Sequence, residues 1–500
     1  MVTVRKSALP ARVGLYYIGL AVYWEQFAGL RERLEKYGTF VRERLGASAK
    51  VSDFGIVDSE QKAREAGEFF NRENVDLLVC FAATYATSAA HIAVPQICKR
   101  PVLVLNLQPA ERMDYARTGT GEWLAQCCAC CVPEISNAFA RCGIPFHVVS
   151  GLLGLPESPA SSVSNEATAT HPDAVSAWRQ IEEWVRAAGV QRTLQQSRMG
   201  FLGHTYPGML DMYSDFTMIT AQTGLHVEVL EMCDLAQMEQ KVRPCEVESK
   251  REEVLRIFEV SGDSPSDPLA RRPSQEQLEA ACRSSVALDN LVHEYDLDVL
   301  TYYYRGRDDN RYQQLQESLI LGLSLLTAGG VPCAGEGDMK TGVAMKICDA
   351  LGVGGSYSEI VATDFVDQTI LMGHDGPFHI SIADRKPILR GLGVFHGKAG
   401  KGVSVEAKVR RGPITNLGIS QTLDRRLKMI VSQGTATEGE ILHIGNTMTP
   451  VRFAKRPAPF MDEWFALGPT HHFAMSIGHN AEQFKKVATL LNWDFSAVAL

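Results

Sequence analysis

The chain has no excess of positive charge, which argues against broad electrostatic binding of nucleic acid. Its 500 residues include 50 lysines and arginines and 58 aspartates and glutamates, giving a formal net charge of −8. Proteins that bind nucleic acid or anionic lipid generally present a basic face. The sequence also contains no run of about 18 uninterrupted apolar residues, the length needed to span a membrane. We therefore expect neither nucleic acid nor a membrane among its partners.

The sequence also lacks the glycine-rich turns that bind nucleotides. After the first apolar run, 13–20, no GxGxxG turn follows, because the chain reads Ile-Gly-Leu-Ala at 18–21. Such a turn is needed for close backbone contact with a pyrophosphate. Gly200, Gly203 and Gly208 do not supply a phosphate loop in any standard spacing. A nucleotide-dependent enzyme is therefore disfavoured.

Cysteine is too sparse for a disulfide scaffold, with 12 residues in 500. Several cysteines lie in apolar runs, as Cys80 does, and this usage indicates reduced thiols and a cytoplasmic location. Four more form the cluster Cys127, Cys128, Cys130 and Cys131. Because this cluster lacks two CxxC pairs separated by a loop, we interpret it as buried small side chains and not as a metal site.

Hydrophobic periodicity changes along the chain. Over the first 150 residues, short apolar runs alternate with helical patterns, which indicates βαβ units and a parallel sheet covered on both faces. A second alternating series begins at 199, after the Pro-, Ser- and Thr-rich stretch 154–173. Beyond Gly355 the apolar period becomes two, which predicts antiparallel strands. The strands expected there are 379–383, 403–409, 428–431 and 441–444.

These patterns predict an α/β protein with three domains. Residues 1–195 and 196–355 should each form a Rossmann-like domain of flavodoxin type, built on a parallel sheet. Residues 356–500 should form a β-rich, barrel-like domain closed by a helix at 481–491.

The strongest chemical signal is the segment 334–341, Ala-Gly-Glu-Gly-Asp-Met-Lys-Thr, which lies between a predicted strand and a predicted helix. Ligands collect at the carboxyl ends of strands in open α/β sheets, so Glu336 is placed where sites form. Gly335 and Gly337 allow the backbone to approach a ligand closely. The pattern is equally compatible with a simpler role in which Asp338 caps the helix and Glu336 complements its dipole.

Two later elements add acids and histidines. Asp364 precedes the apolar strand 369–372, which leads into His374, and the adjacent pair His471 and His472 follows near the C-terminus. Alone, His374 would be a turn residue and the pair would belong to a surface loop. Together with Glu336, these residues form a mixed oxygen and nitrogen set that suits a divalent ion such as Mn²⁺, Mg²⁺ or Co²⁺.

The order GEGDxKT, acid, Gly-His and His-His resembles the L-arabinose isomerase and L-fucose isomerase superfamily. The resemblance covers the whole chain, because two α/β domains followed by a β-rich domain is the architecture of that family. It implies that Glu336 is a metal ligand and acid/base group, and that Asp364 is the second acid, with Glu359 as the alternative. It also makes His374 and His472 metal ligands, although in the fucose-type branch the His374 position need not bind metal.

The chemistry of such a site suits the interconversion of an aldose and its ketose. One proton moves between C1 and C2, another moves between their oxygens, and two carboxylates with a chelated metal can support both transfers. We therefore expect a metal-dependent isomerase of a free monosaccharide, with Glu336 and Asp364 catalytic and Mn²⁺ as cofactor. An epimerase of the same chemistry and a non-catalytic sugar-binding protein are the alternatives. The sequence does not predict which sugar is used.

A sugar also needs a stacking wall and partners for its hydroxyl groups. Candidates are Trp464, Trp24, Lys340 and His471, while a plain core role is the competing explanation for the tryptophans. The resemblance further implies that a neighbouring subunit completes the site, so a homo-oligomer is expected.

Overall fold

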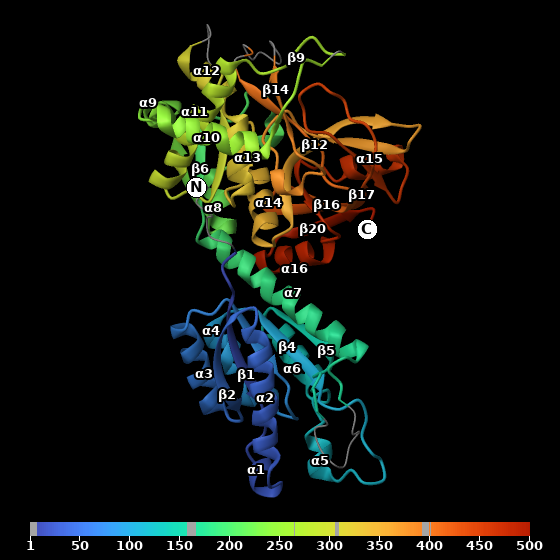
Figure 1. Cartoon of the computed structure of the whole chain (residues 1–500). Coiled ribbons are helices and arrows are strands. Elements are labelled where there is room, and N and C mark those ends of the chain that lie inside the picture. Colours follow the sequence, from blue (N-terminus) through green and yellow to red (C-terminus); the bar gives the residue numbers. More distant parts are fainter. Residues whose placement is uncertain (1–7, 158–166, 265, 306–309, 393–399, 401) are drawn as a thin grey trace. The chain divides into compact units, whose positions relative to one another are not determined.

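The computed structural model describes residues 8–157, 167–264, 266–305, 310–392, 400 and 402–500. Two compact units emerge, an N-terminal unit of Leu9–Arg192 and a C-terminal unit built from Thr193–Leu500 (Figure 1). The expected boundary near 195 falls at this division, whereas the expected boundary at 355 lies inside the C-terminal unit. Among the described residues, no helix is long and apolar enough to cross a membrane.

The N-terminal unit contains a five-stranded parallel sheet in the order β2-β1-β3-β4-β5. Its strands are β1 Arg12–Ile18, β2 Lys50–Val57, β3 Leu77–Phe81, β4 Val102–Gln108 and β5 Phe146–Leu152. This is the flavodoxin-like order, and it confirms the parallel sheet predicted for this part of the chain. Its helices are α1 Tyr23–Gln26, α2 Leu30–Gly46, α3 Glu60–Arg72, α4 Ala93–Cys98, α5 Thr120–Leu124 and α6 Val132–Arg141, with α7 Pro172–Gln195 leading out of the unit.

The C-terminal unit begins with a four-stranded parallel sheet in the order β11-β10-β6-β7, which confirms the second parallel sheet. Its strands are β6 Arg198–Gly203, β7 His226–Leu230, β10 Val299–Tyr303 and β11 Cys333–Ala334. The accompanying helices are α8 Phe216–Thr223, α9 Met232–Gln240, α10 Pro244–Ile257, α11 Gln275–Glu294, α12 Arg311–Glu317, α13 Ile320–Ala328 and α14 Met339–Ala350. A small separate sheet is formed by β8 Glu259–Val260, β9 Ala270–Arg271, β14 Ile388–Leu392 and β15 Val403–Glu406.

Six antiparallel strands of the same unit close into a barrel. They run in the order β16-β19-β12-β13-β18-β17, and β17 pairs back onto β16, while β20 adds to β17 in parallel. The bounds are β12 Gly354–Asp364, β13 Thr369–Gly373, β16 Gly412–Gln421, β17 Leu427–Ala436, β18 Thr449–Phe453, β19 His472–Ile477 and β20 Asp494–Val498, with helices α15 Pro457–Ala466 and α16 Ala481–Leu491. The barrel-like expectation is thus confirmed.

The predictions of strands at 379–383 and 441–444 were wrong. The segment Ile380–Ile382 forms one 3-10 turn, closed by the amide of Ile382 donating to the carbonyl of His379, and 441–444 has no regular structure. Four or five alternating residues are too few to distinguish a strand from a turn that buries the same side chains. The longer strand β12 was not predicted at all, because apolar and polar side chains follow one another without a clear period in its second half, 359–364.

Helix α14 explains why the chain does not divide at residue 355. Every residue of this helix except Asp349 is buried, and the helix contacts β10 and β11 of the parallel sheet as well as β12, β16 and β19 of the barrel. A helix that is buried all round has no solvent face and belongs to the core of both layers. The parallel sheet and the barrel therefore share one hydrophobic interior.

A buried histidine marks the interior of the N-terminal unit. His91 is 0% exposed, neither of its ring nitrogens has a hydrogen-bond partner in the described part of the chain, and its ring packs edge-on against Phe139 at 6.0 Å between centroids. Burial lowers the pKa of His91 to about 4. The ring is therefore neutral in the folded protein at neutral pH.

This histidine should make the N-terminal unit sensitive to acid. The pKa of His91 in the folded protein lies below the unfolded value of about 6.5, so protonation favours the unfolded chain. The free energy of unfolding should therefore be unaffected by His91 above pH 6.5 and should fall by about 3 kcal/mol as the pH approaches 4. We expect His91→Leu to reduce this loss, measured as the difference in urea unfolding midpoint between pH 7 and pH 4.5. The exposed histidine variant His226→Gln serves as the control, and an unchanged pH dependence in His91→Leu would contradict the assignment.

Candidate metal centre

The loop between β11 and α14 places Glu336 at the carboxyl edge of the parallel sheet, as predicted. Glu336 has a left-handed backbone with φ of +60°, which is rare for a residue with a side chain and stores strain of about 1–2 kcal/mol. Gly337 follows with φ of +72°, and a Cβ at this position would lie 2.5 Å from the carbonyl oxygen of His204. Backbone hydrogen bonds hold the loop: the amide of Tyr206 donates to the carbonyl of Glu336, and the amide of Gly337 donates to the carbonyl of Tyr302.

The barrel register brings the other groups to the same place. In the antiparallel ladders, Glu359 of β12 lies opposite His472 of β19 on one side and opposite Gly373 of β13 on the other. His374 is the next residue after Gly373. Glu359, His374 and His472 therefore meet because three neighbouring strands are in this register, although His472 lies 98 residues beyond His374 in the sequence.

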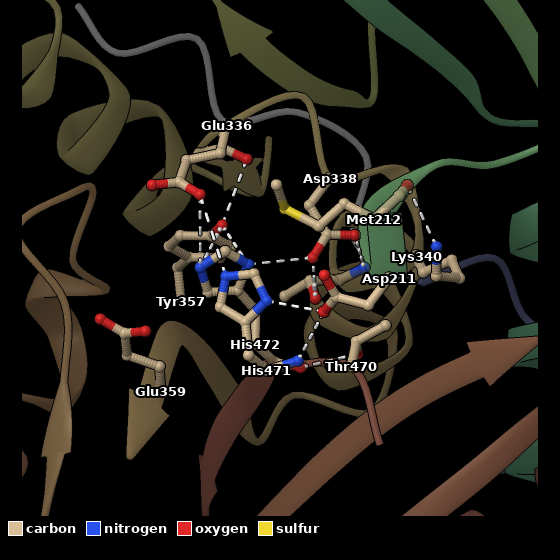
Figure 2. Close-up of polar contacts among 12 residues, drawn as sticks. Asp211, Met212, Glu336, Asp338, Lys340, Tyr357, Glu359, Thr470, His471 and His472 are labelled. Atoms are coloured by element: carbon tan, nitrogen blue, oxygen red, sulfur yellow. Dashed lines mark hydrogen bonds and ion pairs between the residues drawn. The ribbon is translucent and has the colours of Figure 1, made fainter. Parts of the chain in front are cut away.

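Three histidines of the site share one arrangement, in which Nδ1 faces a carboxylate, and Figure 2 shows two of them, His471 with Asp211 and His472 with Asp338. The pairs are His471 with Asp211 at 2.6 Å, His374 with Asp375 at 3.1 Å and His472 with Asp338 at 3.2 Å. A carboxylate at Nδ1 favours the tautomer that carries its proton there and leaves a lone pair on Nε2. The same carboxylate–histidine pairing orients histidine ligands in metal sites.

The Nε2 atoms converge with two carboxylates, and that of His472 also lies 3.0 Å from the hydroxyl of Tyr357. The Nε2 atoms of His374 and His472 are 3.2 Å apart. Around Glu336, the distances to its carboxylate oxygens are 3.8 Å from His472 Nε2, 3.9 Å from His374 Nε2 and 4.0 Å from His471 Nε2. The carboxylate of Glu359 lies 4.0 Å from His374 Nε2. Ligands bound at about 2.1 Å to one octahedral ion lie about 3 Å apart when adjacent and about 4 Å apart when opposite. The observed separations fall in this range.

The electrostatics of the cluster call for a positive charge. Burial raises the pKa of Glu336, whose Oε2 is buried without a hydrogen-bond partner among the described residues. Burial lowers the pKa of His472 to about 4, so this imidazole is a neutral electron-pair donor. For His374, burial acts to lower the pKa, but Asp375, Glu359 and Glu336 raise it overall. A cluster that attracts a proton in this way also attracts a cation.

Asp338 connects the cluster to helix α14. One of its oxygens accepts from the amide of Thr341 and caps the helix, as the simpler sequence interpretation held, while the other lies against His472. Asp338 is completely buried; although burial acts to raise its pKa, the hydrogen bond from His472 and the charge of Lys340 lower it to about 2. The helix cap and the contact with His472 therefore coexist in one carboxylate.

The cluster opens into a cavity of about 530 Å³. Beyond the carboxylates and histidines, its wall consists mainly of side chains with hydroxyl, amide or guanidinium groups, namely Tyr206, Tyr302, Tyr303, Tyr304, Arg305, Gln313, Gln316 and Asn446. The Oδ1 atom of Asn446 is buried and has no hydrogen-bond partner among the described residues. Such a wall offers both stacking surface and hydrogen bonds to a small polyhydroxylated molecule.

The structure does not bring Asp364 to the cluster. This residue ends β12, five residues beyond Glu359, and five residues of strand span about 16 Å. Its carboxylate accepts from the amides of Val366 and Asp367 and so stabilises the exposed turn to β13. The geometry therefore favours Glu359, the alternative considered from the sequence, over Asp364 as the second carboxylate.

Of the substrate-binding candidates, only His471 lies at the cavity. Lys340 is 1% exposed and donates to Met212 and Ser214, which fixes a loop (Figure 2). Trp464 is 3% exposed and packs between Phe460 and Phe473 in the barrel core. Trp24 belongs to the N-terminal unit, where its indole donates to Asp58.

Sequence reasoning missed three residues that support the site. Asp211 lies in a short 3-10 turn, Tyr357 is fully buried in β12 with its hydroxyl 2.7 Å from His472 Nδ1, and Asp375 follows His374. Only Asp375 carried a signal, as the residue next to a candidate ligand. The other two approach the site through tertiary packing.

Comparisons with known proteins yield little. No family model and no curated protein matches the chain. Matching structures include a periplasmic solute-binding protein with bound D-allose from Actinobacillus succinogenes (11% identity, covering 65% of this chain and 77% of that one). They also include a transporter solute-binding protein with bound myo-inositol from Bacillus halodurans (11%, 70% and 92%), and each of the two has a TM-score of 0.16. A transcriptional regulator of the LacI family from Bifidobacterium animalis matches at 13% identity over 65% and 93%, with a TM-score of 0.14. TM-scores of this size support no conclusion about this chain.

A matched pair of variants tests which carboxylate binds the metal. We expect Glu359→Gln to weaken Mn²⁺ binding strongly, because it removes one of the converging charges. Asp364→Asn should leave binding unchanged, because Asp364 lies in an exposed turn. Isothermal titration of both variants with MnCl₂ measures this difference, and the opposite result would restore Asp364 as the ligand.

A second pair of variants at Asp338 separates ligand orientation from helix capping. In Asp338→Asn the amide can still cap α14, but its NH₂ group faces His472 Nδ1 and favours the tautomer without a lone pair on Nε2. We expect Mn²⁺ affinity to fall by about 10–100-fold with little loss of stability. Asp338→Ala should weaken binding similarly and also cost about 1 kcal/mol of stability through the lost cap. Equal Mn²⁺ affinity in Asp338→Asn and the unmodified protein would rule out the orienting role.

Proposed function

We propose that the protein is a divalent-metal-dependent isomerase that interconverts a free aldose and its ketose. The observation that carries the proposal is the convergence of two carboxylates and oriented Nε2 atoms at the floor of a polar cavity. Apart from the Tyr357 hydroxyl, 3.0 Å from His472 Nε2, the converging atoms are acceptors, and a positive charge stabilises such a set. The residue order of the L-arabinose and L-fucose isomerase superfamily adds to this reading.

The donor set fits the metal that this function requires. Glu336, Glu359, His374 and His472 would hold Mn²⁺, with Mg²⁺ or Co²⁺ as alternatives, since mixed carboxylate and imidazole ligands suit hard or borderline ions. Such an ion supplies Lewis-acid stabilisation of negative charge on two neighbouring sugar oxygens. The buried Oε2 of Glu336, which lacks a partner among the described residues, is the clearest sign that the site is built for a further group.

The protein's own groups account for the proton transfers. Glu336 is positioned to take a proton from one of the two reacting carbons and return it to the other, and burial raises the pKa of this carboxyl toward values useful for that exchange. Glu359, on the barrel side, is the second carboxylate, available to the proton that moves between the sugar oxygens. The tyrosines and Asn446 of the cavity wall would bind the remaining hydroxyl groups.

The proposal includes a homo-oligomer in which a neighbouring subunit completes the site, an expectation that comes from the family resemblance alone. Two alternatives share the cavity. An epimerase would use the same metal and carboxylates but release a different product. A non-catalytic sugar-binding protein would need no divalent ion, because a neutral sugar can be bound by hydrogen bonds and stacking.

The function is tested by turnover of free pentoses, hexoses and 6-deoxy sugars in the presence of Mn²⁺. We expect at least one aldose to be converted to its ketose, and we expect Glu336→Gln to reduce this rate by at least about 100-fold through loss of the proton-transferring group. Asp364→Asn is the control and should keep the activity. Circular dichroism establishes that Glu336→Gln remains folded.

The outcomes separate the alternatives. Unchanged turnover in Glu336→Gln would overturn the assignment of its role. If no sugar is converted, and a protein stripped of metal by a chelator binds a sugar with unchanged affinity, the sugar-binding alternative replaces the isomerase. A product that differs from the substrate only in configuration at one carbon identifies an epimerase.

A further inference from the structure

A pair of thiols in the N-terminal unit lies in an unusual arrangement. The Sγ atoms of Cys127 and Cys130 are 2.8 Å apart, and both cysteines are free. They belong to the turn that connects α5 to α6. A disulfide bond of about 2.05 Å would require the two sulfur atoms to approach by only about 0.8 Å.

The turn is held in place at the carboxyl edge of the sheet. The hydroxyl of Thr84, after β3, donates to the carbonyl of Leu124 at 2.7 Å, and the amide of Ala110, after β4, donates to the side chain of Gln126 at 3.2 Å. Cys131 closes the turn from its other end through its own contact with the carbonyl of Thr84. The two thiols are therefore kept together by the fold around them.

The four cysteines of the cluster differ in accessibility. Cys127, Cys128 and Cys131 are buried, in agreement with the packing interpretation, but Cys130 is exposed, and for this residue that interpretation was wrong. Burial raises the pKa of Cys127 and Cys131 to about 12 and that of Cys128 to about 11, so these thiols are poor first targets for an oxidant. Cys130 is the thiol that a reagent in solution can reach.

The buried pair with the same spacing is differently arranged. Cys128 donates to the carbonyl of Gln126, and Cys131 donates to the carbonyls of Thr84 and Cys128. Their thiols thus contact backbone oxygens, whereas Cys127 and Cys130 contact each other. Among the described residues, the groups that could hold a metal ion include no cysteine. The arrangement therefore favours thiol chemistry over metal binding.

We propose that Cys127 and Cys130 form a redox-active dithiol that a hydroperoxide converts to an intramolecular disulfide. The Cys130 sulfur attacks the peroxide oxygen, which breaks the O–O bond and gives a sulfenic acid and, from hydrogen peroxide, one molecule of water. The Cys127 thiol then attacks the sulfenic sulfur, forms the S–S bond and releases a second molecule of water. Two thiols are oxidised by two electrons in total, and one peroxide is reduced.

The test uses the full chain, reduced, freed of reductant and titrated with hydrogen peroxide. Remaining thiols are alkylated with iodoacetamide, and intact mass and tandem mass spectrometry of the tryptic fragment 118–141 locate the change. We expect two of the 12 thiols to disappear together, with a mass loss of two hydrogens that dithiothreitol reverses. Loss of a single thiol, addition of two oxygens at Cys130, or no reaction at peroxide concentrations that leave methionine intact would each overturn the proposal.

Variants assign the pair. Cys130→Ser should abolish disulfide formation, whereas Cys127→Ser should leave a sulfenic acid on Cys130 that dimedone traps. Cys142→Ser is the matched control, because Cys142 is an exposed cysteine of the same unit, and this variant should form the disulfide normally. A disulfide that persists in Cys130→Ser would place the bond among Cys127, Cys128 and Cys131 and contradict the proposal. Because Cys130 is exposed, its replacement by serine should leave the fold intact, which circular dichroism checks.

Discussion

The site depends on a simple constraint, namely that each of three imidazoles has one nitrogen facing its own carboxylate. Asp211, Asp338 and Asp375 take the Nδ1 positions, so the Nε2 atoms have no alternative but to face the interior of the cluster. An unpaired lone pair buried beside carboxylates is costly. The fold nonetheless holds these groups together by several independent means. These are a strained backbone at Glu336, a helix cap at Asp338 and the pairing of three barrel strands.

Much of this arrangement could be predicted from local patterns. Both parallel sheets follow from buried apolar runs alternating with helices, and the closing helix predicted at 481–491 has these bounds in the structure. Glu336 could be placed because a strand followed by Gly-Glu-Gly-Asp and a helix has few geometries. In each case the information lies within a few consecutive residues.

The second carboxylate could not be chosen in the same way. Deciding between Glu359 and Asp364 requires knowing that both lie on one continuous strand and which residue of β19 faces each of them. Strand register is set by packing between distant segments, whereas the preference for Asp364 came from the family resemblance. Trp464 and Lys340 show the same limit. The local sequence around each residue does not reveal that its side chain is buried away from the cavity. Asp211 approaches His471 from 260 residues away, which no pattern in a single sequence reveals.

The position of α14 has a consequence for how this protein can vary. One end of the helix carries Asp338 into the metal cluster, and its sides fill the space between the parallel sheet and the barrel. An exchange of the barrel for that of a relative would leave half of the helix against foreign side chains and would shift the carboxylate that orients His472. Recombination between related chains should therefore succeed at the end of α7 and fail near 355. The parallel sheet and the barrel therefore have to vary together, whereas the flavodoxin-like unit has its own compact core.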